Sequence, residues 1–423
     1  MLVFLSYSMI AIFMYAVMSK RLSALTALVL IPVIFAIFTG HSAELSDMMV
    51  DGVKKLAPTG IMITFAILYF CMMTDAGLFN PLIKLIIKIV KGDPLKIVVG
   101  TGILGICVGL DGDGATTYII VATALLPLYT KIGIRPQVMA TVLLLSIGVM
   151  NILPWAGPFS RAASALKIDP TELFLQMIPV MAAGLLWVLF VAFYLGLKER
   201  KRLGIHQIEH NEELIHEEPN IPTWKSWFNL ALTALLIFVM IKSYISLAPL
   251  FIIAFCIGLV VNFPQLSEQK KLIGKYADSV LAVSTLIFAA GIFVGIMSGT
   301  GMIDAIAQHL ISIIPESSGS FLASITAFIS MPFTYILTND AFYFGILPIL
   351  AETASHYGVG ANEMAIASLI GQPIHLLSPM VASTYLLCSL TNVDYAENQK
   401  NSILWCTGTC MIMYVAAILI GLI

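Results

Sequence analysis

The stretch "GLDGDGATTYII" (109–120) carries two aspartates and three glycines and lies between long apolar segments. Acidic side chains are rare in the hydrocarbon core of a membrane, and glycine weakens a helix. A second stretch, "LTNDAFYF" (337–344), interrupts another apolar segment in the same way. We therefore predict two re-entrant hairpins, in the segments 95–130 and 319–357, with tips at 111–117 and 338–340.

The composition is that of a chain which crosses a membrane many times. Of the 423 residues, 59% are hydrophobic and only 11% are charged, about half of the charged fraction usual in a soluble domain. The net charge of −2 gives no indication of nucleic-acid binding, and the cysteines lack the spacing of a metal site. A spanning helix needs about 20 apolar residues. The apolar runs lie at 2–18, 22–39, 58–78, 136–153, 172–197, 226–245, 247–263, 278–298, 361–377 and 401–421.

The expected fold is an all-α polytopic membrane protein with about 10 transmembrane helices plus the two hairpins. Segment 2–18 lacks a basic leader and a cleavage site, so we interpret it as a retained helix. The positive-inside rule then places the N-terminus outside, with 17 of the 22 lysines and arginines inside. This orientation requires both interrupted segments to be re-entrant, because a full crossing at 111–117 would invert every later loop.

The two halves of the chain resemble each other at an offset of 225 residues. "TKIGIRPQVMA" (130–140) aligns with "SHYGVGANEMA" (355–365), and the same offset pairs Pro154 with Pro379. Both tips and both proline breaks then fall in register, which predicts an inverted repeat of the kind found in secondary transporters. The predicted divisions are N-terminal helices at 1–57, a first repeat at 58–197, a cytoplasmic linker at 198–225, helices at 226–277 and a second repeat at 278–423.

The predicted linker is the only sizeable hydrophilic segment. Its histidines His206, His210 and His216 stand among glutamates and could bind a divalent metal. We favour the simpler interpretation of a solvated linker between two halves.

Four polar clusters carry the chemistry: the two tips, and two helix breaks at "NILPWAGPFSR" (151–161) and "GQPIHLLSPMVAST" (371–384). Backbone groups without partners are tolerated at membrane depth where they line a cavity or are buried in protein. Half-helices at such breaks direct N–H groups toward an anion, and carboxylates at the same depth hold a cation or a proton. The clusters thus predict a binding site at the middle of the membrane.

The ionisable residues of these clusters are functional candidates, because charge is costly in a bilayer. They are Asp111, Asp113, Arg161, Asp340 and His375. Four of them also have a structural explanation: Asp111 and Asp113 can cap helices, Arg161 can extend to the interface, and His375 can be a packing residue. Acids beside one arginine suit an anion that travels with a cation, and divalent cations such as Mg²⁺ and Ca²⁺ prefer oxygen ligands.

Two enzymatic or metal-binding motifs are excluded. "DGDG" resembles the start of an EF-hand loop, but Ala115 and Ala122 occupy positions where that loop needs acids. An intramembrane aspartyl protease would need Gly at position 110, where this chain has Leu110, and a partner Tyr-Asp pair. We therefore expect a transporter without catalytic residues or a resident cofactor.

At the four clusters the sequence resembles the citrate–metal:proton symporter family (CitMHS) of the ion transporter superfamily. The matching stretches span almost the whole chain: "AILYF…DAGLF" (66–79), "KGDPLKIVVGT" (91–101), "LDGDGATTY" (110–118), "GVMNILPWAGP" (148–158), "SGTGMIDAIA" (298–307), "TNDAFYFGILPILAE" (338–352) and "GQPIHLLSPMVASTYLL" (371–387). The resemblance implies uptake of citrate complexed with a divalent metal (Mg²⁺ or Ca²⁺), coupled to protons, across the bacterial cytoplasmic membrane by alternating access. It also suggests a homodimer, by analogy.

The resemblance also implies which residues form the site. The expected substrate-binding residues are Thr116, Thr117, Asn151, Gly157, Ser160, Arg161, Asn339, Ser378, Ser383 and Thr384, with Thr338 at the second tip. Proton or metal coupling falls to Asp111, Asp113, Asp340 and His375, of which Asp111 and Asp113 could face the metal. The superfamily's Ser-Asn-Thr tips are absent, which favours protons or the metal over sodium. The alternative is a proton-coupled transporter of another small organic anion, such as a dicarboxylate or gluconate, without metal.

Overall fold

A computed structural model describes residues 2–90, 92–205, 223–242, 244–314 and 316–423, and helices are the only regular elements in these ranges. By length and composition, seven of the described helices can cross a membrane. They are α3 (Leu45–Asp75), α5 (Pro94–Val108) with the 3₁₀ turn η1 (Gly109–Asp111), α6 (Gly114–Ile132), α9 (Pro170–Leu203), α10 (Thr223–Lys242), α12 (Leu266–Gly299) and α20 (Tyr395–Leu419). The all-α polytopic fold is confirmed. The three histidines of the predicted linker lie outside the described residues.

Shorter helices complete both halves. In the first half these are α1 (Leu2–Met18), α2 (Ala24–Phe38), α4 (Asn80–Val90), α7 (Pro136–Met150) and α8 (Gly157–Leu166). In the second half they are α11 (Leu247–Asn262), α13 (Met302–Ile313), α14 (Glu316–Gly319), α15 (Leu322–Ile336), the π-helical turn η3 (Ala341–Ile346), α16 (Leu347–Ser355), α17 (Ala361–Leu369), α18 (Gln372–His375) and α19 (Ala382–Thr391).

Three helices in each half begin at positions that correspond at the offset of 225 residues. α7 begins at Pro136 and α17 at Ala361, α8 begins at Gly157 and α19 at Ala382, and α9 and α20 begin at 170 and 395. The caps agree as well. Gly133 and Gly358 both have left-handed backbones, with φ of 83° and 80°. The aspartates Asp169 and Asp394 both cap the following helix. The same backbone pattern thus occurs twice.

Each interrupted segment forms a pair of packed helices joined at a tip. α5 packs against α6, and α15 packs against α16. The first tip turns at Gly112, whose φ of 76° favours glycine, and Asp113 then caps α6. The second tip turns at Leu337, and the Thr338 hydroxyl accepts a hydrogen bond from the Ala341 N–H at 3.2 Å. The breaks lie where the polar residues of the sequence predicted them.

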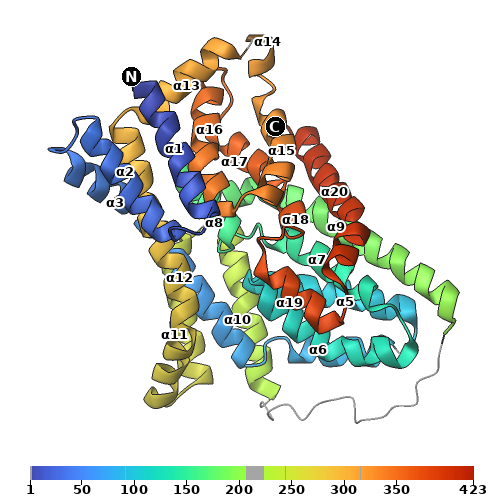
Figure 1. Ribbon diagram of the computed structural model, residues 1–423. Coiled ribbons are helices and arrows are strands. Elements are labelled where there is room, and N and C mark those ends of the chain that lie inside the picture. The colour runs from blue at the N-terminus through green and yellow to red at the C-terminus, as the bar shows by residue number, and fades with distance from the viewer. Residues whose placement is uncertain (1, 91, 206–222, 243, 315) are drawn as a thin grey trace.

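Two groups of helices stand side by side in Figure 1. One contains α1, α2, α3, α11 and α12, and the other contains α5, α6, α7, α9 and α20. α3 and α12 cross very closely, because a Cβ on Gly52 would stand 2.0 Å from the Gly291 carbonyl oxygen. Small residues allow such close approach between membrane helices. α8 contacts both α12 and η3, so the first broken helix connects this crossing to the second tip.

Charged residues gather at the helix ends. At the end of α9, the buried Glu199 carboxylate pairs with Arg135 and Arg202. Lys275 of α12 pairs with Asp75 at the end of α3, with a distance of 2.7 Å between the Lys275 ammonium and a carboxylate oxygen. The 34 residues of α9 extend about 50 Å, since each residue adds 1.5 Å, so its two ends lie far apart. Ion pairs of arginine and lysine with carboxylates therefore lie at the ends of these long helices.

Candidate functional site

The first tip is organised by its two aspartates. The Asp113 carboxylate accepts hydrogen bonds from the N–H groups of Ala115 (3.2 Å) and Thr116 (3.0 Å), and from the Thr116 hydroxyl (2.5 Å). Asp111 is buried and accepts from the Asp113 N–H at 2.8 Å, with the Thr117 hydroxyl 3.5 Å away. Asp113 therefore caps α6, as its structural explanation predicted, yet it stays exposed and can still reach a ligand.

The first tip is fixed against the first helix break. The Trp155 indole N–H donates to the Leu110 carbonyl oxygen at 2.8 Å, and its ring stacks on Phe70. A side chain on Gly112 would stand 3.0 Å from the Trp155 ring, so glycine is needed for this contact as well as for the turn. A Cβ on Gly114 would stand 3.4 Å from the Ser383 hydroxyl oxygen at the start of α19. The tip thus contacts both halves of the chain.

An ion pair joins the first break to the second tip. The Arg161 Nε of α8 donates to an Asp340 carboxylate oxygen at 2.5 Å, and the side chains are 16% and 18% exposed. Gly157 makes room for this arginine, because a Cβ there would stand 2.6 Å from the Arg161 Nη1. A partly buried, partly hydrated pair of this kind can exchange partners with an ionic ligand, since the arginine presents further donors.

A buried glutamine links the remaining polar groups. The Gln372 carbonyl oxygen accepts from the Asn151 amide at 3.3 Å, while its own amide donates to Asn339 (3.1 Å) and to the Tyr343 hydroxyl (2.8 Å). Gln372 is completely buried. The sequence interpretation missed this residue. Its signal was a buried-type polar residue directly before Pro373 in the second break.

Four other predicted residues bond to nearby backbone. Ser160 donates to the Gly157 carbonyl at 2.9 Å, Ser378 accepts from the Met380 N–H at 3.2 Å, and Thr384 donates to the Leu376 carbonyl. The His375 Nδ1 stands 2.6 Å from the Thr334 carbonyl oxygen and therefore carries a proton, because a carbonyl only accepts. These hydroxyls and this imidazole hold the breaks in shape, while Arg161, Asp340, Asn151 and Asn339 are the residues brought together across the two halves.

The acids of the site do not form a metal centre by themselves. Within the described residues, no group of three or more histidine, cysteine, aspartate or glutamate side chains is arranged to hold a metal ion. Mg²⁺ and Ca²⁺ each require six or more oxygen ligands.

A helical membrane protein in which two hairpin tips and two broken helices bring polar side chains together has the architecture of a secondary transporter. The chain belongs to the citrate transporter family CitMHS, whose family model matches residues 10–371. It is a multi-pass membrane transporter and not an enzyme.

Two relatives and one solved structure are similar to this chain. A citrate transporter of Bacillus subtilis (strain 168) is 51% identical over 427 residues, which cover all of both chains. A Mg(2+)/citrate complex secondary transporter of the same organism is 49% identical over 431 residues, covering all of this chain and 99% of the relative. The YdaH transporter of Alcanivorax borkumensis, whose crystal structure has an unusual topology, matches with a TM-score of 0.62 at 14% identity and covers 90% of this chain and 89% of that one. The last likeness concerns the fold alone.

Proposed function

We propose that this protein imports citrate complexed with a divalent metal cation, driven by protons that travel in the same direction. Family membership supports citrate as the substrate. The relative that carries the Mg²⁺–citrate complex supports a metal in the cargo. The scarcity of metal ligands in the site agrees with a metal that arrives already held by citrate.

The ion pair between Arg161 and Asp340 is the observation that carries the proposal. In this arrangement Asp340 forms an ion pair with Arg161, the residue that a citrate carboxylate would need as its partner. A proton on Asp340 removes its negative charge and releases the guanidinium, which then pairs with the substrate. Citrate binding is thereby favoured by protonation, and the proton and the anion move together.

The proposed binding set contains two kinds of residue. Direct contacts to the complex come from Arg161, Asn151, Asn339, Thr116, Ser383 and the backbone at Gly157, which are all partly exposed. The buried hydroxyls of Thr117, Ser160, Ser378 and Thr384 maintain the shape of the tips and breaks. Asp113 is the exposed carboxylate available to the metal, while Asp111 and His375 are further proton carriers.

Transport requires the site to face each side in turn. We propose that the two halves form an inverted repeat, with the N-terminus outside the bacterial cytoplasmic membrane and the basic ends of α9 and α12 inside. The tips and broken helices then move against the helix group that contains α3 and α12. A homodimer would give this moving part a fixed support.

Radiolabelled citrate uptake into proteoliposomes tests the function. Vesicles are assayed with Mg²⁺, Ca²⁺, Mn²⁺, Zn²⁺ or EDTA, each with and without a protonophore. We expect uptake that requires a divalent metal and collapses when the proton gradient is removed. Uptake that persists with EDTA would mean that the substrate is free citrate. Uptake that is unchanged by the protonophore would mean that transport is not coupled to protons.

A further inference from the structure

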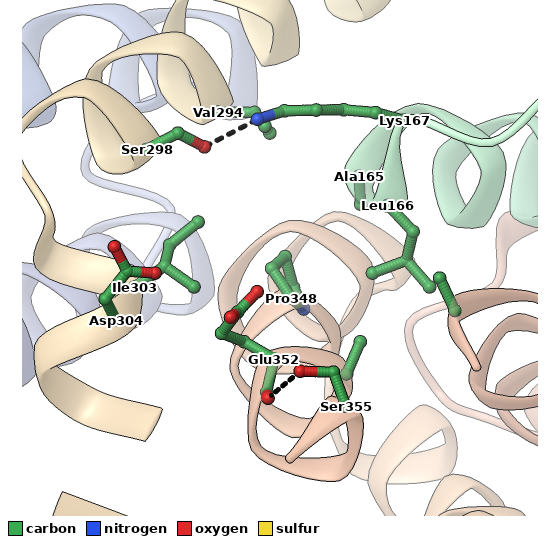
Figure 2. A pocket seen from close by; sticks show the side chains of 12 residues that line it. Ala165, Leu166, Lys167, Val294, Ser298, Ile303, Asp304, Pro348, Glu352 and Ser355 are labelled. Carbon is green, nitrogen blue, oxygen red and sulfur yellow. Dashed lines mark hydrogen bonds between the residues drawn. The ribbon is translucent and has the colours of Figure 1, made fainter. Parts of the chain in front are cut away.

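A second polar pocket lies away from the tips, between the ends of α8, α12, α13 and α16. It has a volume of about 250 Å³, and none of the site residues described above lines it. Its polar lining comes from Lys167, Ser298, Asp304, Glu352 and Ser355. Figure 2 shows both carboxylates directed into the space beside the lysine.

The pocket lies on the two elements that form the central ion pair. α8 carries Arg161 and reaches the pocket at Ala165, four residues later, which corresponds to about 6 Å of helix. Asp340 directly precedes η3, and the same helical run continues through α16 to Glu352. A ligand in the pocket would therefore touch the far ends of both elements that the Arg161–Asp340 pair joins.

The charges of the pocket are of both signs. The Lys167 ammonium donates to the Ser298 hydroxyl at 2.6 Å, which holds the long side chain across the pocket. Burial and the positive charge of Lys55 lower the pKa of Lys167, and the opposing effect of the Glu352 and Asp304 carboxylates is smaller. Asp304 and Glu352 stand opposite, and neither forms an ion pair with another described residue. An anionic ligand group would offset the positive charge of the lysine, and a cation would offset the negative charges of the two acids.

We propose that this pocket is an outer binding site for a divalent cation chelated by a small carboxylic acid. The acid's free carboxylate would pair with Lys167, and the metal's remaining positions, or the waters on them, would face Asp304 and Glu352. The identity of the chelator rests on the function proposed above. In that setting the pocket gathers the metal–citrate complex before it passes to Arg161.

Neither half of the complex suits the pocket alone. A bare divalent cation would find the two carboxylates, but it would lie beside the positive charge of Lys167 and would leave that charge without an added partner. A free tricarboxylate would pair with Lys167 but meet two negative charges. In the complex, the chelator supplies most of the metal's ligands and the metal offsets the acids' repulsion. The pocket therefore selects the preassembled complex.

Manganese electron paramagnetic resonance on the purified full chain tests this site directly. Mn²⁺ is titrated with and without citrate into Arg161→Ala, in which the central site is disabled. We expect citrate-dependent Mn²⁺ binding to remain in Arg161→Ala, and to weaken about tenfold or more when Lys167→Gln and Glu352→Gln are added. The matched control is Lys54→Gln with Asp51→Asn, which removes the same charges from exposed positions on α3.

Two results would overturn the proposal. One is Mn²⁺ binding that is the same with and without citrate, which would make the pocket a bare-cation site. The other is citrate-dependent binding that survives the pocket substitutions. If Lys167→Gln folds poorly, Asp304→Asn provides the same test, because it leaves the contact between Lys167 and Ser298 in place.

Transport kinetics separate this proposal from the function itself. With Arg161 intact, the pocket substitutions should raise the KM for metal–citrate about tenfold and leave the maximal rate unchanged. An unchanged KM would contradict a role in gathering substrate. If the wild-type protein takes up no citrate at all, the proposed function fails, and the resonance titration still decides whether the pocket binds a chelated metal.

Discussion

Three helices in each half of this transporter, α7 to α9 and α17, α19 and α20, begin at corresponding positions but carry different side chains. The segment from α7 to α8 corresponds in position to the segment from α17 to α19, but the site residues of one segment do not recur in the other. At the offset of 225 residues, Arg161 corresponds to Leu386, Asn151 to Leu376, and Asp340 to Ala115. Each half supplies groups that the other lacks.

This difference explains why the central contacts run between halves. Arg161 of the first half meets Asp340 of the second, and Gln372 of the second half meets Asn151 of the first. A site shared in this way changes whenever one half moves against the other. The comparison therefore predicts that substituting a residue of the site will reduce transport much more than substituting the residue at the corresponding position in the other half.

Arg161→Ala should have the largest effect. Truncating one partner of a partly buried charge pair costs about 2–5 kcal/mol, which corresponds to a loss of citrate uptake of about 30-fold or more. The counterpart substitution Leu386→Ala should reduce uptake only through packing. The measurement is the initial rate of citrate uptake in proteoliposomes that contain equal amounts of folded protein. Equal losses in both variants would contradict the prediction that the two halves contribute differently to the site.

Asp340→Asn should separate citrate movement from proton movement. In the wild type, the Asp340 carboxylate competes with a citrate carboxylate for Arg161. Asparagine carries no charge, so the variant should bind citrate without this competition. One coupled proton gives about tenfold accumulation per pH unit of gradient. The variant should lose this accumulation and keep citrate exchange, and a variant that still concentrates citrate would exclude Asp340 as the coupling group.

Gly157→Ala should displace Arg161 without removing its charge. The added Cβ would stand 2.6 Å from Nη1, so the guanidinium must shift away from its present position. Because the clash is with the far end of a flexible side chain, its cost falls at the low end of overpacking, about 1 kcal/mol, which predicts a KM raised about fivefold. The counterpart position already holds alanine, so Ala382→Gly serves as the control and should leave the KM unchanged. A normal KM in Gly157→Ala would mean that the arginine does not bind substrate from this position.

Gln372→Ala should weaken the connection between the halves. Its loss leaves Asn151, Asn339 and Tyr343 without one partner each, and an unsatisfied buried polar group costs about 1–3 kcal/mol. We expect a lower melting temperature and a several-fold slower transport rate. Gln399→Ala is the matched control, because the partners of Gln399 among the described residues are Tyr335, Leu377 and Tyr395, all in the second half. It should lower the melting temperature and spare transport.

The sequence predicted the fold where hydropathy and breaks agree. α1 and α11 have nearly the predicted bounds, and both tips turn where the polar residues lie. α3 and α12 are longer than their apolar runs, because each helix begins in a polar segment, at 45–57 and 266–277, before its apolar run. Lys275 in the second of these segments pairs with Asp75 at the end of α3. The amphipathic helices α4 and α13 were not predicted, since neither is apolar over a full span.

The site was predictable only in part. Charge in an apolar setting identified Arg161 and Asp340 as candidates, but no pattern in the sequence joins residues 179 positions apart. Gln372 was not predicted, because a neutral amide costs less free energy in a membrane than a charged group and is therefore a weaker indicator of function. Tertiary contacts decided which polar residues meet, and these depend on how the two halves are placed together.

The smallest effects should fall where the two halves are alike. Gly133 and Gly358 occupy corresponding turns with φ of 83° and 80°, and a Cβ at either position meets no atom closer than 3.8 Å. Alanine in a left-handed backbone costs about 1–2 kcal/mol. Gly133→Ala and Gly358→Ala should therefore lower the melting temperature by similar small amounts and leave the KM for citrate unchanged. A large difference between the two variants would mean that the halves differ in backbone as well as in side chains, because these turns carry no group of the site and report the shared scaffold alone.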